Sequence, residues 1–510
     1  MTYEPEKSDP SILARKPTNK FGRSEAESVE RREGAEGNTD EHRTRRTLSR
    51  ERVSSGLDRV RERARQEKKE RFTALLHHVT ADQLRAAFSW LKRDAAPGVD
   101  GITWQEYGQN LEVNLADLHA RLHRGAYRAQ SSRRKFIPKE DGRQRPLGIA
   151  SLEDKIVQRA VVEVLNAIYE EDFLGFSYGF RPRRSQHDAL DALAFAITRT
   201  KVNWILDSDL SAYFDSVSHD WLVRFIEHRI ADPRIIRLIR KWLKAGVLAD
   251  GQLTVPEAGT PQGAVASPLL GNVYLHYAFD LWAERWRHHE ARGQVALVRY
   301  ADDIVAGFEH RVDAERFLAD LRVRLEKFAL SLHPDKTRLI EFGRYAAENR
   351  ARRGLGKPET FNFLGFRHIS GHSRAGRFQL KRKTRRDRMR AKMRSLKEEL
   401  RRRRHEPIPQ QGRWLAQVIR GYFAYHAVPT NAKSLYAFRQ HVIDLWRRSL
   451  RRRSQKDHTT WQRMARLAAA FLPTPRVLHP WPDDRFAVNH PRWEPSARIG
   501  PARIYAGGVQ

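Results

Sequence analysis

Two short apolar runs in this chain carry aspartates where buried strands seldom have a charge. The run WILDSDLSAYF contains Asp209, and the run LVRYADDIVAGFE contains Asp302 and Asp303, 93 positions further on. An isolated Asp–Asp pair between apolar runs is most often an ordinary turn, because the short carboxylate bonds to nearby backbone. Buried strand positions, by contrast, rarely hold Asp unless it is paired or bound to a cation. If the two runs are neighbouring strands of one sheet, their carboxylates converge, and that pairing constrains the fold more than any other feature.

Carboxylates held so close together repel one another, and divalent cations are the natural way to neutralise them. Mg²⁺ prefers oxygen ligands from one or two carboxylates together with substrate phosphates. Two such ions, about 3.5–4 Å apart, can clamp the attacking and leaving oxygens of a phosphoryl displacement. Asp209, Asp302 and Asp303 therefore predict a site for two Mg²⁺ ions, with Mn²⁺ as an alternative. Asp207 and Asp215 lie beside Asp209 in the first run, and we expect them to make structural hydrogen bonds.

The amino-acid composition limits the kinds of partner and of functional site that the chain can have. The 510 residues include 95 Lys and Arg against 62 Asp and Glu, a formal net charge of +33, which predicts binding to a polyanion such as nucleic acid. Cysteine is absent, which excludes disulfides, thiol catalysis and cysteine-ligated zinc. No apolar run approaches the roughly 20 residues of a membrane-spanning helix. The start does not resemble a secretory signal, so we expect a cytoplasmic protein without membrane contact.

Residue patterns along the chain predict an α+β protein. Residues 1–50 are charged and poor in aromatic and β-branched residues, which predicts a disordered arm. Strand-like and helical runs alternate between about 130 and 370. Residues 381–453 read as helical and hold 23 Lys or Arg against 5 Asp or Glu, interleaved with aromatics. Such a mixture suits backbone contact and base stacking on nucleic acid, or a helical bundle with an aromatic core and a solvated basic face, and we expect both.

Several sequence blocks together resemble one known family. YADD at 300–303 is similar to the polymerase motif of reverse transcriptases, and further blocks occur in the order found in those encoded by bacterial group II introns. These are APGVDG (96–101), FIPKEDGRQRPLGIASLEDKIVQRAV (136–161), GFSYGFRPRRSQHDAL (175–190), DLSAYFDSVSHDWL (209–222), GTPQGAVASPLLGNVYL (259–275), LSLHPDKTRLIEFG (330–343), FNFLGF (361–366), RGYFAYHAVP (420–429) and LRRRSQ (450–455).

The resemblance implies a right-hand polymerase fold. Fingers and palm, built from an antiparallel sheet and helices, would be followed by a helical thumb and maturase region. The expected divisions are the arm at 1–50, a helical N-terminal extension of the fingers at 51–130, fingers and palm at 131–375, the basic thumb and maturase region at 376–480, and a C-terminal tail at 481–510.

The resemblance also implies roles for particular residues. Asp209 and Asp302 would be the main metal ligands, with Asp303 completing the acidic set and the Leu210 carbonyl adding an oxygen. Phe214 would lie under the sugar of the incoming nucleotide, where a bulky ring excludes a ribose 2′-OH and favours deoxynucleotides.

Other matched positions would contact the nucleotide and the primer. Lys139 and Arg145 lie in the block that grips the triphosphate. Gln262 would contact the nucleotide from the other side, and Lys336 would protonate the departing pyrophosphate, unless it is a plain surface lysine. The hairpin that holds the primer end would consist of Phe363, Leu364, Gly365 and Phe366.

RNA contacts are expected from the basic thumb region. The candidates are arginines and a lysine at its two ends: Arg382, Lys383, Arg385, Arg386, Arg447, Arg448, Arg451 and Arg452. The expected partners are group II intron RNA, an RNA template, a DNA primer and dNTPs.

The resemblance leaves three functions open. The main hypothesis is an RNA-directed DNA polymerase that also binds its own intron RNA as a maturase. A domesticated, intron-free reverse transcriptase in DNA repair or phage defence is one alternative, and a splicing cofactor that only binds RNA is another. Because the chain has no cysteine, we expect it to lack the zinc-containing HNH endonuclease that many group II intron proteins carry.

Overall fold

The computed structural model describes residues 56–138, 144–249, 252–260, 263–453 and 459–489, and these form the expected α+β fold. The predicted arm at 1–50, together with Lys139 and Gln262, lies outside the described residues. No helix among the described residues is long and apolar enough to span a membrane.

The palm sheet contains both acidic runs. It has four antiparallel strands in the order β6 (Val295–Tyr300), β7 (Asp303–Phe308), β3 (Trp204–Asp209) and β8 (Arg338–Glu341). Helices α6 (Gln186–Arg199) and α12 (Arg311–Glu326) pack against it, which buries β6 and almost all of β7. The apolar runs on either side of Asp302 are therefore the two strands of a β-hairpin, as the sequence predicts.

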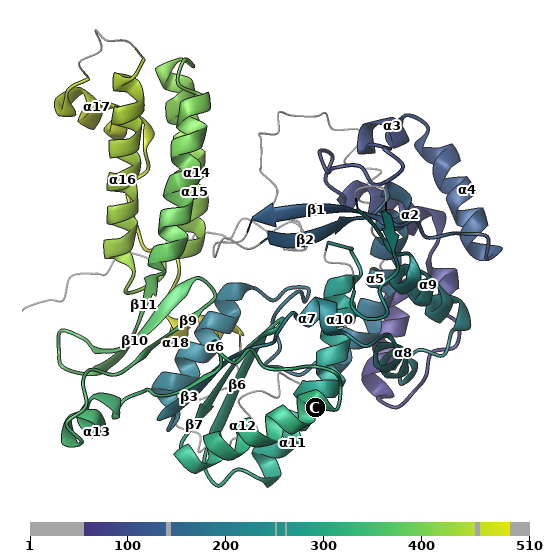
Figure 1. Cartoon of the computed structure of the whole chain (residues 1–510), viewed down its shortest axis with the longest axis horizontal. Coiled ribbons are helices and arrows are strands. Elements are labelled where there is room, and N and C mark those ends of the chain that lie inside the picture. The colour runs from purple at the N-terminus through teal and green to yellow at the C-terminus, as the bar shows by residue number, and fades with distance from the viewer. Residues whose placement is uncertain (1–55, 139–143, 250–251, 261–262, 454–458, 490–510) are drawn as a thin grey trace, which may run out of the picture.

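The fingers lie beside the palm and consist of a small sheet and many helices (Figure 1). The sheet order is β2 (Gln144–Ile149), β1 (Ser132–Pro138), β4 (Val247–Ala249) and β5 (Gln252–Thr254). The helices that precede this sheet in the chain are a helix at residues 56–66, η2 (Leu76–His78), α2 (Ala81–Trp90), α3 (Trp104–Gln109) and α4 (Leu111–His123). Further helices are α5 (Leu152–Asp172), α7 (Tyr213–Ser216), α8 (His219–Glu227) and α9 (Pro233–Lys244).

One long helical stretch contains a π-helical turn in its middle. The segment SPLLGNVYLHYAFDLWAERW forms α10 (Ser267–Leu275), a π-helical turn η3 (His276–Asp280) and α11 (Leu281–His289). Such turns are rare, and many of them occur at functional sites.

A second hairpin sheet joins the palm to the thumb. It has the strand order β11 (Phe378–Thr384), β10 (Phe366–His372) and β9 (Thr360–Phe363), and α13 (Ala346–Arg352) precedes it. The stretch from 376 therefore begins with a strand, where the sequence predicted only helix. The thumb helices follow: α14 (Arg386–Arg402), α15 (Ile408–His426), α16 (Ala432–Arg451) and α17 (Trp461–Phe471). The last described helix, α18 (Pro482–Asn489), packs on α6.

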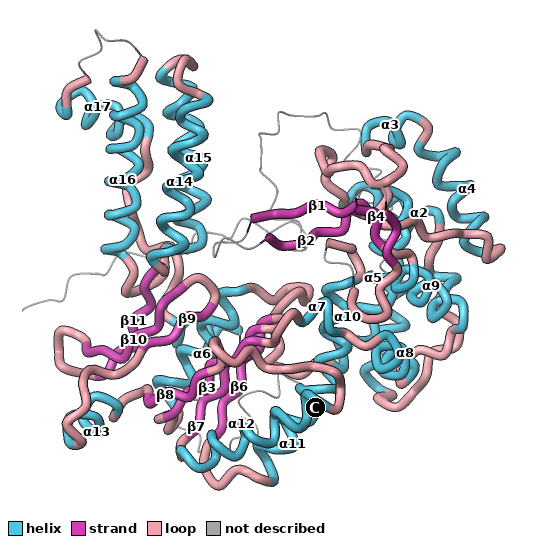
Figure 2. The backbone as a smooth tube through the Cα atoms, in the orientation of Figure 1, coloured by secondary structure: helices cyan, strands magenta, loops and turns pink. Residues whose placement is uncertain are grey.

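Fingers and palm share one large apolar core, whereas the thumb helices have a separate, smaller one. Figure 2 shows the thumb helices on one side of the molecule, the N-terminal helices on the other, and the palm strands below and between them. The acidic ends of β3 and β7 thus lie in the middle of the molecule.

Candidate active site

The acidic residues meet at the ends of two neighbouring strands. Asp209, the last residue of β3, lies directly opposite Asp303, the first residue of β7. Tyr300 pairs with Asp303, so Ala301 and Asp302 form a two-residue turn between β6 and β7. Ala301 has the left-handed φ of 56° that tight hairpin turns favour. The predicted convergence of the two acidic runs is therefore confirmed.

Burial and repulsion between carboxylates both act on the acidic residues at this point. Burial, followed by the neighbouring charges of Asp302 and Asp209, raises the pKa of Asp303 to about 8. The ammonium group of Lys336 forms an ion pair with the carboxylate of Asp209, which offsets part of the negative charge. The predicted Lys336 thus lies at the acidic cluster and is not a remote surface lysine.

The donor set suits a hard divalent cation. Among the described residues, no three His, Cys, Asp or Glu side chains form a ready-made metal cage. Mg²⁺, however, is commonly held by one or two carboxylates and substrate phosphates. Asp209 and Asp303 lie opposite each other at the ends of β3 and β7, and Asp302 lies in the adjoining turn, so three carboxylate residues share one edge of the sheet. Asp209, Asp302 and Asp303 therefore fit such an ion, and Leu210, which continues β3, is buried next to them.

The two neighbouring aspartates differ from each other. Asp207 lies two residues before Asp209 on the same face of β3 and forms an ion pair with Arg338 across the sheet, at 3.6 Å. Burial raises the pKa of Asp207 to about 6. Asp215 on α7 is exposed. The structural contact expected for Asp207 is therefore present.

Phe214 is held near the acidic cluster by two loops. Ala212, with a left-handed φ of 43°, starts the short helix α7 directly after β3. The carbonyl of Phe214 accepts a hydrogen bond from the backbone N–H of Thr260, at 2.7 Å. A side chain at Gly259, whose φ is 93°, would be strained, and its Cβ would lie only 3.0 Å from that same carbonyl. The segment that leads to Gln262 therefore packs on the helix that carries Phe214.

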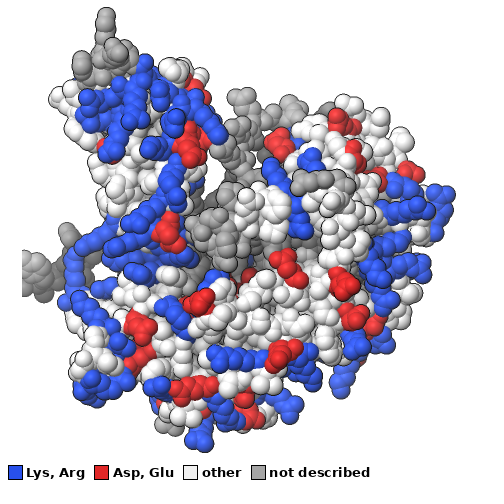
Figure 3. Space-filling model, viewed as in Figure 1, with Lys and Arg blue, Asp and Glu red and all other residues white. Residues whose placement is uncertain are grey.

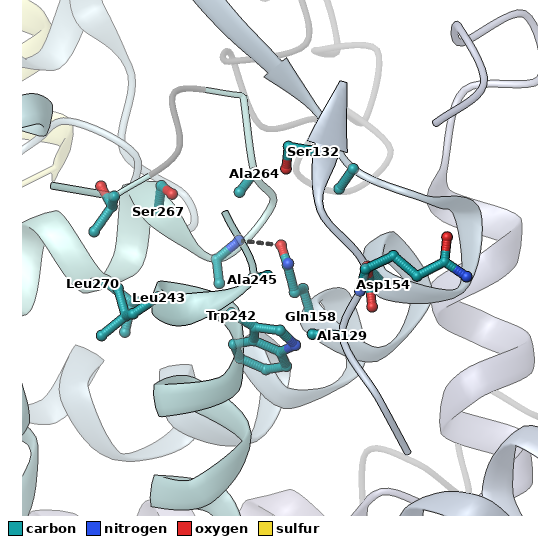
Figure 4. A pocket seen from close by; sticks show the side chains of 14 residues that line it. Ala129, Ser132, Asp154, Gln158, Trp242, Leu243, Ala245, Ala264, Ser267 and Leu270 are labelled. Carbon is teal, nitrogen blue, oxygen red and sulfur yellow. Dashed lines mark hydrogen bonds between the residues drawn. The ribbon is translucent and has the colours of Figure 1, made fainter. Parts of the chain in front are cut away.

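The same loop also packs on the fingers sheet. A Cβ on Gly263 would lie 2.8 Å from the carbonyl of Gly148 in β2, the strand that also contains Arg145. Below the loop, Ala266 donates a backbone hydrogen bond to Gln158 of α5 beside a cavity of about 20 Å³ (Figure 4). Gly263, the described residue after Gln262, therefore lies beside β2, the strand that contains Arg145.

The predicted primer hairpin is a tight turn tied to the thumb. Phe363 and Phe366 pair as the last residues of β9 and the first of β10, and Leu364 and Gly365 both have positive φ, 45° and 78°. The hydroxyl of Tyr425 on α15 donates to the Leu364 carbonyl at 2.7 Å. The backbone of the hairpin is therefore fixed from the thumb side.

Most of the predicted RNA-binding residues lie at the thumb surface. Arg386, Arg448, Arg451 and Arg452 are exposed, and Figure 3 shows Lys and Arg side chains gathered over the thumb helices. Lys383, Arg385 and Arg447 are partly exposed.

Arg382 needs a correction. It is only 2% exposed, and its guanidinium donates to Asp191 of α6 at 2.8 Å. A charge buried in such a pair cannot leave it without exposing its partner to an apolar interior. Arg382 therefore has a structural role, and the prediction of RNA contact was wrong for this residue.

Sequence reasoning missed a buried arginine behind the acidic turn. Arg299, three residues before Asp302, is fully buried and pairs with Asp280 of the π-helical turn, at 2.6 Å. Its position in an apolar strand was the available signal, because a buried charge requires a partner.

Known proteins match this chain over the region just described. A family model for reverse transcriptase (RNA-dependent DNA polymerase) matches residues 137–368. Protein YkfC of Escherichia coli (strain K12) is 36% identical in an alignment of 318 residues that covers 56% of this chain and 78% of that protein. The group II intron-encoded protein LtrA of Lactococcus lactis subsp. cremoris is 34% identical over 222 residues, 43% of this chain and 37% of that protein. Together with the paired aspartates, these matches show that the chain belongs to the family of group II intron reverse transcriptases and maturases and is an RNA-directed DNA polymerase.

Proposed function

We propose that this protein copies RNA into DNA by two-metal nucleotidyl transfer at Asp209, Asp302 and Asp303, and that its thumb binds group II intron RNA to assist splicing. The observation that carries the proposal is the pairing of Asp209 with Asp303 across β3 and β7, with Asp302 in the adjoining turn. The basic thumb surface supports the RNA-binding part.

The acidic residues and their neighbours would have different roles in nucleotidyl transfer. Two Mg²⁺ ions held by the three carboxylates, with the Leu210 carbonyl, would stabilise the charge on the attacking and leaving oxygens. Lys336, which already forms an ion pair with Asp209, would donate its proton to the departing pyrophosphate. Phe214 would contact the sugar of the incoming nucleotide.

Other residues would bind the substrates at this centre. Lys139 and Arg145 would bind the triphosphate, and Gln262 would contact the nucleotide from the opposite side. The turn at Leu364 and Gly365 would hold the end of the primer, since its backbone is fixed by Tyr425 and by the Arg385 N–H.

Primer extension on an RNA template tests the proposal. In the presence of Mg²⁺, the double variant Asp302→Ala plus Asp303→Ala should lose dNTP incorporation by about a thousandfold or more, because the charge stabilisation at the reacting oxygens is lost. Binding of intron RNA should stay within about threefold of the unchanged protein. Unchanged incorporation by the double variant would refute the metal assignment.

The same experiment separates the alternative of a splicing cofactor that only binds RNA. Such a protein would bind intron RNA and support splicing, but the unchanged chain would incorporate no dNTP. Splicing assays with the double variant then tell whether the two activities use separate sites.

A further inference from the structure

Arg299 on β6 uses all of its hydrogen-bonding capacity behind the acidic turn. A guanidinium has five N–H donors. Nε and Nη2 of Arg299 donate to the two carboxylate oxygens of Asp280 at 2.7 and 2.6 Å, and Nη2 also donates to the Ser177 hydroxyl at 2.7 Å. Nη1 donates to the side-chain oxygen of Asn272 and to the backbone carbonyl of Ala301, both at 3.0 Å. One side chain thus joins two helical segments and a loop to the first residue of the turn.

The partner of Arg299 is placed by an irregular piece of helix. Asp280 is the last residue of the π-helical turn η3, and it is fully buried. Replacing a buried ion pair with apolar residues is often neutral or stabilising, so stability alone is a weak reason for one here. A geometric task for the pair is therefore the better explanation.

The turn that Arg299 contacts adopts an unfavourable backbone conformation. Ala301 has a φ of 56°, a region that residues other than glycine rarely enter. Gly179 packs against it so closely that a Cβ there would lie 2.3 Å from the Ala301 nitrogen. The Gly179 carbonyl in turn accepts a hydrogen bond from Asn272 at 2.7 Å. Because Asn272 also accepts from Arg299, the turn is held from two sides by one connected network.

We propose that Arg299 is the positioning residue of the active site, holding the Ala301 carbonyl so that the left-handed turn presents Asp302 and keeps Asp303 opposite Asp209. This inference rests on the proposed polymerase function. It concerns the direction of the carboxylates, while the nucleotide and metal ions would contact Asp209, Asp302 and Asp303 directly.

The proposal is tested with Arg299→Lys, which keeps the charge but loses the fork that reaches both Asp280 and Ala301. We expect kcat for dNTP incorporation to fall by about 10- to 100-fold, since a misplacement of about 1 Å at a reacting centre can cost that much. KM for dNTP should change by less than about threefold. If Arg299→Lys does not fold, Asp280→Asn takes its place in the test. This variant removes the ion pair from the other side and should lower kcat by a similar factor.

Ala301→Gly provides the decisive second change. Glycine enters the left-handed region without steric cost, so the turn would depend less on Arg299. We expect the double variant Arg299→Lys plus Ala301→Gly to have a kcat at least about fivefold higher than Arg299→Lys alone. Its unfolding temperature should stay as low as that of Arg299→Lys. Arg229→Lys is the matched control, because Arg229 is also buried and pairs at 2.8 Å with Asp172, the last residue of α5. It should lower the unfolding temperature but leave kcat unchanged.

Mn²⁺ binding gives a readout that does not require turnover. Titration of the protein–primer–template complex with Mn²⁺, followed by electron paramagnetic resonance, should show weaker binding in Arg299→Lys and recovery in the double variant with Ala301→Gly. The proposal would be overturned if Ala301→Gly, added to Arg299→Lys, restored neither kcat nor Mn²⁺ affinity. It would also be overturned if Arg229→Lys lost as much kcat as Arg299→Lys. A wild-type chain that incorporates no dNTP would instead refute the polymerase function, and the Mn²⁺ titration would still decide the role of Arg299.

Discussion

The palm and the thumb differ in how deeply their ion pairs are buried. In the palm, Arg299 and Asp280 form an ion pair in which neither side chain is exposed. In the thumb, Arg448 and Asp444 also pair, at 2.8 Å, but 69% of the arginine side chain is exposed. Charge in the palm is part of the packed interior and sets backbone geometry, whereas charge in the thumb covers an apolar core. Substitutions in the palm should therefore alter chemistry, and those in the thumb should alter stability and affinity for RNA.

The largest effect is expected in the thumb core. Trp446 is fully buried there, and its indole N–H donates to Gln411 at 2.9 Å. Trp446→Ala should destabilise the thumb by about 3–5 kcal/mol, because it leaves a cavity and an unpaired amide. Since the two cores are separate, we expect an early unfolding transition in calorimetry while the palm transition stays in place.

Trp461→Ala is the control for that variant, because 48% of Trp461 is exposed on the same helical region. It should change the unfolding temperature far less. A single transition that shifts as a whole in Trp446→Ala would show that palm and thumb unfold as one unit.

In the palm, Phe214→Ala should change selectivity for the sugar. Removing the ring opens the space that a ribose 2′-OH would need, so we expect ribonucleotide incorporation relative to dNTP to rise about 10-fold or more. Competition between rNTP and dNTP in primer extension measures this ratio. An unaltered preference would show that Phe214 does not exclude the 2′-OH, and RNA affinity should stay the same in either case.

Exposed thumb arginines should affect affinity in a salt-dependent way. The double variant Arg451→Glu plus Arg452→Glu should weaken binding of intron RNA about 10-fold and reduce the slope of log affinity against log salt by one to two. Arg285→Glu plus Arg322→Glu, two exposed positions on the palm helices α11 and α12, is the matched control. An equal loss in both double variants would mean that overall charge, rather than the thumb surface, determines binding.

The last effect concerns pH and involves two buried histidines. Burial lowers the pKa of His276 and of His368 to about 3, well below the ordinary value of 6.5. The unfolded chain therefore takes up protons first as the pH falls. Each neutral histidine contributes stability that is fully present above about pH 6.5 and is lost toward pH 3, at about 1.4 kcal/mol per pH unit.

Thermal unfolding of the palm between pH 7 and pH 5 checks this expectation. His276→Gln should make the decline shallower by the contribution of one group. A decline of the same steepness in that variant would exclude His276 as a source of the pH dependence.

Several elements could be predicted from the chain because their causes are local. The hairpin around Ala301 and Asp302 follows from apolar alternation on both sides of a turn, and the tight turn at Leu364 and Gly365 follows from turn chemistry. The long helix α5 follows from apolar residues at helical spacing. The neighbourhood of β3 and β7 was also expected, because several aspartates in apolar strands need a common partner.

Other features were missed because they arise from contacts between distant segments. Nothing near Arg382 in sequence distinguishes it from Arg386, yet one is buried against Asp191 and the other is exposed. Likewise, helical periodicity through SPLLGNVYLHYAFDLWAERW gives no sign of the π-helical turn that brings Asp280 to Arg299.

The α+β class, the basic character and the acidic motif are therefore properties of neighbouring residues, and they can be predicted from the sequence alone. The pairing of each charge is not, since Arg382 meets a carboxylate 191 positions away and Arg299 meets one 19 positions away. Which arginines become part of the interior and which remain free for RNA depends on how these segments pack, because a buried charge is tolerated only where the fold brings it a partner.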